Sequence, residues 1–486
     1  MRFNSMSSVN GIGTRMRTNA KIFMLKGAQK GLRFIQGHPR LTEKAQNVLD
    51  TITPMPALGP ELVPVEGGQL GHDVNAAVDR LSNKVSLHLM QSLGNESTRE
   101  WGITDQHENV RETVRKFCDT DENKKFFKTL HKTDRFPRGL FEVMTESMGL
   151  LGAIIPEQYG GSDMDARAIS IIMEELAYFS PAVALSYDIA GGLIPHILME
   201  HGSKEQKEKY LTAIARGDTI ASFGLTDTSS GTDLSSMKTS AVRNGNEFVI
   251  NGSKRFITNA TEADLIVLFA KARGEEKSES SFSAFLVEPK VLQGLSVHQM
   301  NDKMGCKGSG TAELFFDDVR IPAESLIGNI GDGRTIALDS LNLARIEISA
   351  FVLGMARRAL DIAADYVQNK KSFGAPLATK QAIQKDFGEM RVKLEMAKQM
   401  IYRAAWLADQ GKDYRYVAAE AKVAAVSLAS EIVDMAQRKL GGDGYMDEYE
   451  ISRIVGDLRV AFPGEGDNDI LQIVLGAETL GVRKSL

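Results

Sequence analysis

The chain has 486 residues, more than one ordinary domain, and its 43% hydrophobic and 25% charged residues are typical of a soluble globular protein. A net charge of −5 provides no basic field, which argues against nucleic acid as a partner. Cys118 and Cys306 lie far apart without metal-ligand spacing, and no apolar run approaches the roughly 18 residues of a membrane span, so we expect a soluble intracellular protein without a disulfide framework, structural metal or transmembrane segment.

Residues 1–100 form an extension with a composition of its own. No Asp or Glu precedes Glu43, whereas eight Lys and Arg residues do. Such a start is typical of a mitochondrial transit peptide, and equally of a basic tail on a bacterial protein. The Pro-rich residues 53–68 indicate a linker. The compartment is thus the mitochondrial matrix if the source is eukaryotic and the cytoplasm if it is bacterial.

Residues 101–219 are predicted to be α-helical. Apolar residues recur three and four apart over 108–118, 138–150 and 167–177. Ser203-Lys-Glu-Gln206 is a capping box that opens a further helix, which Gly217 closes.

Residues 220–330 are predicted to form an antiparallel β domain. Asn244-Gly245 is a strong hairpin signal. Short β-prone runs bounded by turn residues follow; they are 248–250, 264–269, 282–287 and 313–316.

Residues 331–486 return to helical periodicity. The long segments are 345–369, 380–410 and 416–440, and the short loops between them favour an antiparallel four-helix bundle. The fold class is therefore α+β, with a helical domain, a β domain and a second helical domain.

Four segments carry potential chemistry. The segment 223–233 gathers hydroxyl and glycine residues that could face an anion, and 251–259 could set an aromatic ring and a hydroxyl on one face of a strand. Glycines at 440–445 break a long helix. The segment 462–471 places Glu465 in a tight turn before a helix that Asp467 or Asn468 would cap. Capping explains those two residues but leaves Glu465 unexplained.

From about residue 103 onward, these segments resemble the acyl-CoA dehydrogenase family in their order and in their amino-acid sequence. Further matches are 302–322, Arg345 with 358–361, and 371–374. The residues of 465–471, together with 223–231, most resemble the very-long-chain branch of the family. We expect the chain to lack the extra C-terminal membrane-associated domain of that branch. The resemblance implies a homotetramer that binds FAD and an acyl-CoA and passes electrons to electron-transfer flavoprotein.

The resemblance also implies roles for individual residues. Phe223, Leu225, Thr226 and Thr232 would line the flavin and pyrophosphate, Phe256 would cover the ring, and Thr258 would lie near its N5 and O4 edge. A neighbouring subunit would supply the adenosine half with Phe373, Gln381, Gly441 and Gly442. Asp469 joins the cofactor residues, and Thr232, Gly464 and Gly466 join the substrate side.

Glu465 occupies the family's base position, where it would take the thioester α-proton while FAD accepts the β-hydride. We expect its pKa to be raised in an apolar pocket when substrate is bound. Some relatives carry the base just before the helix arginine, but here that residue is Ala344. Glu347 is expected to be structural, and Arg345 either supports the substrate side or forms a helix-to-helix ion pair.

Three departures affect the cofactor contacts. Lys370 replaces an arginine that binds pyrophosphate in the family, Asp467 replaces a threonine, and Arg438 replaces a glutamine. Lysine keeps the charge but loses bidentate geometry, and Asp467 would repel pyrophosphate unless it caps the last helix.

The predicted function is α,β-dehydrogenation of a fatty acyl-CoA. Small residues at 184, 191 and 192 would permit a deep acyl tunnel, and Gly464 would admit bulky or branched acyl groups; kinship to the very-long-chain branch favours long chains. The alternatives are an acyl-CoA oxidase-like flavoenzyme and a non-catalytic subunit or assembly factor of the same fold.

Overall fold

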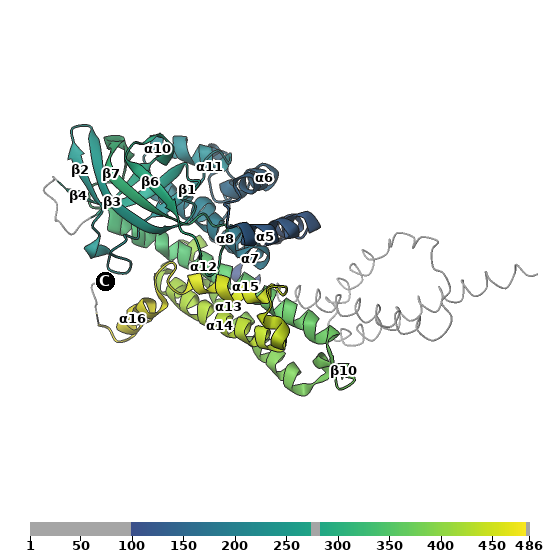
Figure 1. Cartoon of the computed structure of the whole chain (residues 1–486). Helices are drawn as coiled ribbons and strands as arrows, with labels where there is room; N and C mark the ends of the chain where they lie inside the picture. Colours follow the sequence, from purple (N-terminus) through teal and green to yellow (C-terminus); the bar gives the residue numbers. More distant parts are fainter. Residues whose placement is uncertain (1–98, 274–281, 483–486) are drawn as a thin grey trace, which may run out of the picture. The chain divides into compact units, whose positions relative to one another are not determined.

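The computed structural model describes residues 99–273 and 282–482. The predicted extension, 1–100, falls almost wholly outside them, so its targeting role stays a prediction. The described chain runs from helices through strands to helices again (Figure 1).

The first block is helical and begins on polar caps. Thr104 and Ser203 each form a capping box, and Gly217, with φ +82°, follows the last helix as expected. Its main elements are α4 (Asp105–Cys118), α5 (Asp121–Thr133), α6 (Arg138–Met148), α7 (Ala166–Phe179), α8 (Pro181–Tyr187), α9 (Ile194–His201), α10 (Lys204–Gln206) and α11 (Thr212–Ala215), with π-helical turns η4 (Asp188–Leu193) and η5 (Lys207–Leu211).

One apolar segment corrects the sequence analysis. Pro181–His201, which comprises α8, η4 and α9, is long and apolar enough to cross a membrane by length and composition alone. Its most apolar window is 89% buried inside the protein. The statement that no run approaches this length was wrong, because a core helix enclosed by protein on all sides has the composition of a membrane span.

The β domain contains one large sheet. Its strands are β1 (Ala221–Gly224), β2 (Ser240–Asn244), β3 (Glu247–Ile257), β4 (Leu265–Arg273), β5 (Ser283–Val287), β6 (Leu295–Gln299), β7 (Ala312–Pro322) and β8 (Leu326–Ile327). The order is β6-β7-β3-β2-β4-β5-β8, with β1 beside β4. The β2–β3 hairpin turns at Gly245 as predicted. However, β4 pairs in parallel with β1 and β2, so the sheet is mixed rather than antiparallel; side-chain alternation carries no information on strand direction.

Strand β4 lies at the junction of two hydrophobic cores. Alternate residues face opposite sides of a strand, and both sides of β4 are buried, which explains its continuous apolar run. Leu265, Val267 and Phe269 join the core shared with the helices, while Ile266, Leu268 and Ala270 join the core inside the sheet.

The second helical block consists of α12 (Gly333–Asn369), α13 (Gln381–Asp409), α14 (Arg415–Lys439), α15 (Ile451–Leu458) and α16 (Asn468–Thr479), with the small hairpin β9 (Lys371–Ser372) and β10 (Ala375–Pro376). Helix α12 begins at 333 instead of the expected 345. Helices α12, α13 and α14 pack on one another, α15 is short and packs on α14, and α7 packs on α12. The two helical blocks therefore share one core.

Candidate active site

Glu465 lies in a tight turn between η11 (Arg459–Ala461) and α16. Its backbone has φ +54°, in the left-handed region that residues with side chains rarely occupy, and Gly466 follows with φ +99°. Such a conformation costs roughly 1–3 kcal/mol and persists only where its surroundings hold it. The turn therefore fixes the position of the carboxyl group that the sequence analysis selects as the base.

Lys422 of α14 holds this turn, and the sequence analysis missed it. Its fully buried Nζ donates to the carbonyl oxygens of Phe462 at 2.9 Å and Gly466 at 2.7 Å, and to Asn468 Oδ1 at 2.6 Å. These acceptors lie on both sides of Glu465. The signal that could have revealed Lys422 is its helical spacing from the buried Ala418, which places a lone cation on a core face.

Arg345 approaches the turn from α12. Its Nε donates to the backbone carbonyl of Glu465 at 3.3 Å, and its Nη1 donates to Asn342 Oδ1 at 2.7 Å. Burial raises the pKa of Glu465, while the positive charges of Lys422 and Arg345 oppose that rise. The net direction is upward, as a base that works near neutral pH requires.

Asp467 caps α16; it is one of the two residues that the sequence analysis named as the N-cap. Its carboxylate accepts a hydrogen bond from the Asp469 backbone N–H at 2.9 Å, so its charge is directed at the helix N-terminus. Asp469 itself is exposed in the first turn. Gly464 and Gly466 flank the base and are partly buried; a Cβ at Gly464 would lie 3.0 Å from the carbonyl oxygen of Val460.

The loop after β1 is held by a buried ion pair that the sequence did not reveal. Lys254 Nζ of β3 lies 2.5 Å from Asp227 Oδ1 and also donates to the Leu225 carbonyl at 2.9 Å. Asp227 Oδ2 accepts from the backbone N–H groups of Lys238 and Thr239 at 2.6 and 3.0 Å. Burial lowers the pKa of Lys254 to about 8, against the attraction of Asp227. This pair fixes the loop against β3, two residues before Phe256.

The predicted flavin residues of this loop differ in exposure. The Phe223 ring packs edge-on against Phe269 with centroids 5.1 Å apart, and Leu225 is buried. Thr226 is partly buried and Thr232 is exposed. Phe223 and Leu225 therefore contribute to the core as well as to the predicted site.

Phe256 and Thr258 do not share a regular strand face, which corrects the sequence analysis. Phe256 has φ +60° at a register shift between β3 and β7, and Thr258 lies just beyond the end of β3. The bulge turns the Phe256 ring outward, where it is 60% exposed, and the Arg255 guanidinium lies 4.9 Å from the ring centroid. An exposed aromatic face thus lies next to a hydroxyl at the strand end.

The remaining predicted cofactor residues lie at the other end of the bundle, near β10 (Figure 1). All are exposed; they are Lys370, Phe373, Gln381, Arg438, Gly441 and Gly442. Lys370 pairs with Asp443 at 3.4 Å, which brings it to the glycine turn, and Arg438 pairs with Asp434 at 2.8 Å. Along α14, Arg438 is ~24 Å from Lys422, so one chain does not bring this group to Glu465.

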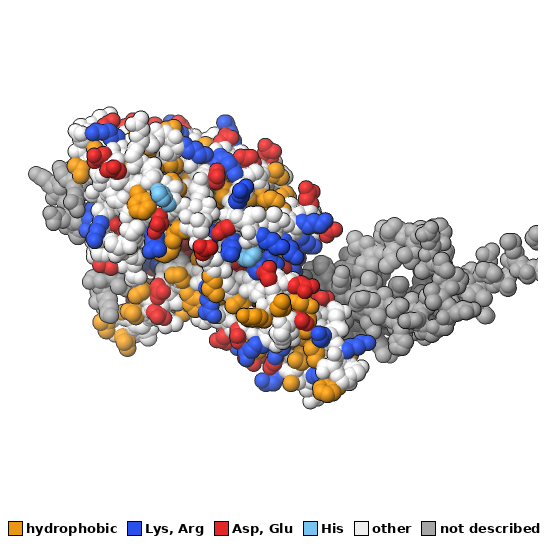
Figure 2. Space-filling model, in the orientation of Figure 1, with side chains coloured by type: hydrophobic (Ala, Val, Ile, Leu, Met, Phe, Trp, Pro, Cys, Tyr) orange, Lys and Arg blue, Asp and Glu red, His pale blue; other side chains and the backbone are white. Residues whose placement is uncertain are grey.

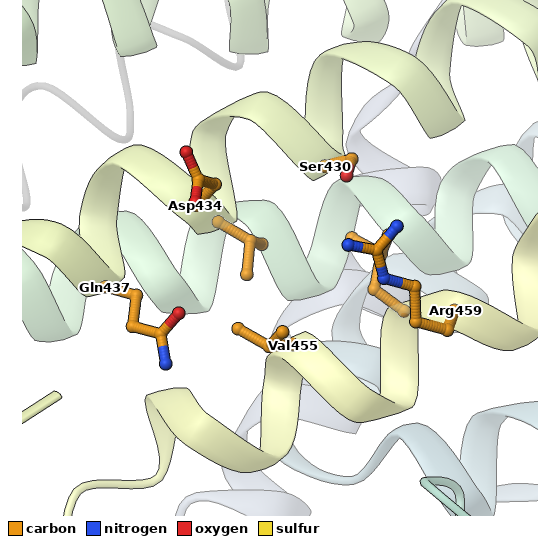
Figure 3. Close-up of a pocket in the computed structure, with 7 residues that line it drawn as sticks. Ser430, Asp434, Gln437, Val455 and Arg459 are labelled. Carbon is orange, nitrogen blue, oxygen red and sulfur yellow. The ribbon is translucent and has the colours of Figure 1, made fainter. Parts of the chain in front are cut away.

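A small surface hollow lies between α14 and α15 (Figure 3). Ser430, Asp434 and Gln437 line it from α14, and Val455 and Arg459 line it from the opposite side. It contains none of the predicted site residues, and its Asp434 is already paired with Arg438.

Comparison with known proteins gives one consistent result. Three family models match in order: the N-terminal domain of acyl-CoA dehydrogenase over residues 104–218, the middle domain over 222–319 and the C-terminal domain over 331–480. The probable acyl-CoA dehydrogenase YngJ of Bacillus subtilis is 36% identical, and the short-chain specific enzyme of Clostridium acetobutylicum is 34% identical; each alignment covers 78% of this chain and 99% of the relative. The structure of butyryl-CoA dehydrogenase from Megasphaera elsdenii matches with a TM-score of 0.74 and 32% identity, over 78% of this chain and 99% of that one.

Proposed function

This chain belongs to the acyl-CoA dehydrogenase family, and from that premise we propose that it removes hydrogen from the α- and β-carbons of an acyl-CoA, with Glu465 as the base. The family, the fold and the FAD cofactor expected from the sequence are confirmed, so the chain is an FAD-dependent oxidoreductase. The observation that carries the proposal is the strained turn in which Lys422 and Arg345 hold Glu465.

The thioester α-proton is weakly acidic, so its removal needs a base of raised pKa and a polarised carbonyl. Glu465 provides the first, because burial raises its pKa. Its left-handed backbone fixes the carboxyl in one position, which supplies the orientation that a near-attack geometry requires. FAD, when bound, accepts the β-hydride. Arg345, which contacts the base turn directly, serves the substrate side rather than a structural ion pair.

The residues at the strand end fit an isoalloxazine ring. Phe256 offers an exposed aromatic face, and Thr258 supplies a hydroxyl group two residues further along the chain. Thr226 lies beside this strand, because its backbone carbonyl accepts a hydrogen bond from the Arg255 N–H at 2.9 Å. Thr232 is exposed in the same loop, where it can meet pyrophosphate or substrate. Phe223 packs against Phe269 and Leu225 is buried, so both residues anchor the loop to the core.

The exposed cofactor residues near β10 would contact the FAD that is bound to a neighbouring copy in a homotetramer. A Cβ added at Gly441 or Gly442 would meet nothing within 4 Å, and Phe373 is 98% exposed. Open glycines and an exposed aromatic residue at the end of a bundle are features of an interface between copies. Lys370, Gln381 and Arg438 lie in the same region. Lys370 would contact the pyrophosphate, Gln381 would contact the adenosine half, and Arg438 would be a further cofactor contact. We propose electron-transfer flavoprotein as the acceptor.

The test is turnover of Glu465→Gln with acyl-CoA and an artificial electron acceptor. We expect turnover to fall by about 10³-fold or more, because an amide cannot accept the α-proton, while bound FAD is retained. Glu478→Gln, an exposed acid on α16, is the matched control. Wild-type turnover in Glu465→Gln would refute the role of the base. Peroxide formed without an added acceptor would favour an oxidase, and absence of flavin bleaching by any acyl-CoA would favour a non-catalytic subunit.

A further inference from the structure

Three neighbouring polar side chains inside the protein have atoms that no described residue outside their own cluster satisfies. Tyr187, Asp188 and Glu347 are each 0% exposed. The Tyr187 hydroxyl and all four carboxylate oxygens of Asp188 and Glu347 lack a hydrogen-bond partner in the described part of the chain. Burying such groups unpaired is costly, so this cluster differs from an ordinary core.

The two acids lie close together, and no cation among the described residues contributes to their pKa shifts. Burial raises the pKa of Asp188, and the charges of Glu347 and Glu465 raise it further. Burial likewise raises the pKa of Glu347 to about 7. With one proton between them the carboxyl groups can bond to each other, but the remaining oxygens and the Tyr187 hydroxyl stay unsatisfied.

The sequence analysis expected the small residues at 184, 191 and 192 to permit a deep acyl tunnel. The side chains of this cluster occupy the space beside Gly191 and Gly192 instead. A Cβ at Gly192 would lie 2.6 Å from both carboxylate oxygens of Glu347, and one at Gly191 would lie 2.4 Å from the Tyr187 ring. The glycines therefore make room for polar side chains rather than for a long apolar tunnel. Asp188 opens the π-helical turn η4, a deviation often found at functional sites.

The cluster also faces the base. Glu347 follows Arg345 by two residues on α12, η4 packs on the same helix, and the charge of Glu465 reaches both acids. A substrate with its α-carbon at Glu465 must leave its large, charged CoA portion in solvent. Its acyl tail then points inward, where these three groups lie.

We propose that Tyr187, Asp188 and Glu347 form the end of the acyl pocket and select an acyl group of modest length whose tail carries a hydrogen-bond donor, an ammonium or a hydroxyl. The proposal rests on the function proposed above and names its substrate class. A donor at the tail satisfies acceptors that are otherwise unpaired, and an ammonium also supplies the missing positive charge. A methyl end leaves the acceptors unpaired, and a carboxylate end adds repulsion.

The experiment compares matched thioesters on the full-length holoenzyme. Heptanoyl-CoA, 6-hydroxyhexanoyl-CoA, 6-aminohexanoyl-CoA and adipoyl-CoA present methyl, hydroxyl, ammonium and carboxylate ends, and shorter homologues are run beside them. Flavin bleaching reports whether each compound reacts, and kcat/KM gives the preference. We expect a donor-ended compound to exceed its methyl-ended counterpart by about 10²-fold, because a site built to bond a polar group rejects analogues that lack it.

Two variants test the residues. Glu347→Gln keeps the shape and removes the charge, so the ammonium compound should lose its advantage while the hydroxyl compound keeps most of its own. Glu347→Met with Asp188→Leu should reverse the preference toward heptanoyl-CoA. The control is Asp339→Asn. Asp339 lies on α12 outside the cluster and pairs with His201 at 3.1 Å. This variant should retain the wild-type order of substrate preference.

The outcomes separate the two proposals. Bleaching by heptanoyl-CoA equal to or faster than by every donor-ended compound, at all chain lengths, would overturn the inference and leave the dehydrogenase intact. A wild-type preference for donors that survives in both variants would also overturn it. Failure of every acyl-CoA to bleach the flavin would overturn the dehydrogenase itself.

Discussion

Two buried acidic clusters in this protein have opposite surroundings. In the first, Glu174 and Glu175 of α7 meet Arg111 and Arg357; Arg111 lies 2.9 Å and Arg357 2.8 Å from Glu175 oxygens. The Tyr402 hydroxyl donates to Glu174 at 2.7 Å. Burial would raise the pKa of Glu174, but the two arginines together lower it to about 2.

In the second cluster, Asp188 and Glu347 are as deeply buried, but no arginine within residues 99–273 and 282–482 pairs with them, and burial raises their pKa values. Residue type and depth are the same, so the neighbours decide the state of the acid. We call acids that are paired with arginines balanced, and acids that lack such a partner unbalanced. Balanced acids join helices to one another, whereas unbalanced acids remain available to a ligand. On the face drawn in Figure 2, charges of both signs lie interspersed among the described residues.

The largest expected effect comes from breaking the balanced cluster. Arg357→Met should lower the free energy of unfolding by about 3–5 kcal/mol, because it leaves buried carboxylates unpaired. Substrate preference should not change. Urea unfolding of the holoenzyme measures the loss.

The neighbouring Arg358→Met is the control. Arg358 pairs with the partly exposed Glu450 at 2.6 Å, and loss of a pair open to solvent costs about 1 kcal/mol or less. Equal losses in the two variants would mean that the balanced cluster has no special structural role.

Glu465 combines features of both clusters, because it has two nearby cations and a raised pKa. Lys422→Met should reduce kcat by about 10²-fold, since it frees the turn that orients the carboxyl. The lysine charge lowers the pKa of Glu465, so its removal should raise that pKa further and move the acidic limb of the pH–rate profile to higher pH.

Lys398→Met is the control, since Lys398 is a buried lysine beside the balanced cluster, with a pKa that burial lowers to about 8. It should change stability without moving the pH profile. A kcat loss in Lys422→Met with an unshifted profile would reduce Lys422 to a purely structural residue.

The sequence predicted what depends on local signals. The Ser203 capping box, the hairpin turn at Gly245, the Asp467 cap and the carboxyl-bearing turn at Glu465 are each encoded within a few residues. The order of the helical and β blocks followed from periodicity.

What the sequence did not predict depends on contacts between distant segments. Lys422 donates hydrogen bonds to a turn that begins 40 residues further along the chain. Asp227, in the loop after β1, pairs with Lys254 on β3. Asp188 and Glu347 lie on different helices, so nothing local marks them as a pair. Glu347 was expected to be structural, and only its missing partners indicate another role.

The smallest expected effect concerns how the free energy of unfolding depends on pH, which has opposite signs for the two clusters. Glu347 has a pKa raised to about 7 in the folded protein, against about 4.3 when unfolded. The folded state thus holds the proton more tightly, and the stability it contributes is present below about pH 4.3 and lost as pH rises through 7. Glu174 behaves oppositely: its contribution is present above that value and lost as pH falls toward 2.

Between about pH 5 and 8, then, Glu174 contributes no slope and the second cluster does. Glu347→Gln should remove on the order of 2 kcal/mol of the fall in unfolding free energy across this window. Asp188 and Glu465 also have raised pKa values, so the measured quantity is the difference between the variant and wild type in urea unfolding at each pH. Parallel pH curves for the two proteins would mean that Glu347 has a partner when folded, and the contrast between balanced and unbalanced acids would fail at the residue on which it depends most.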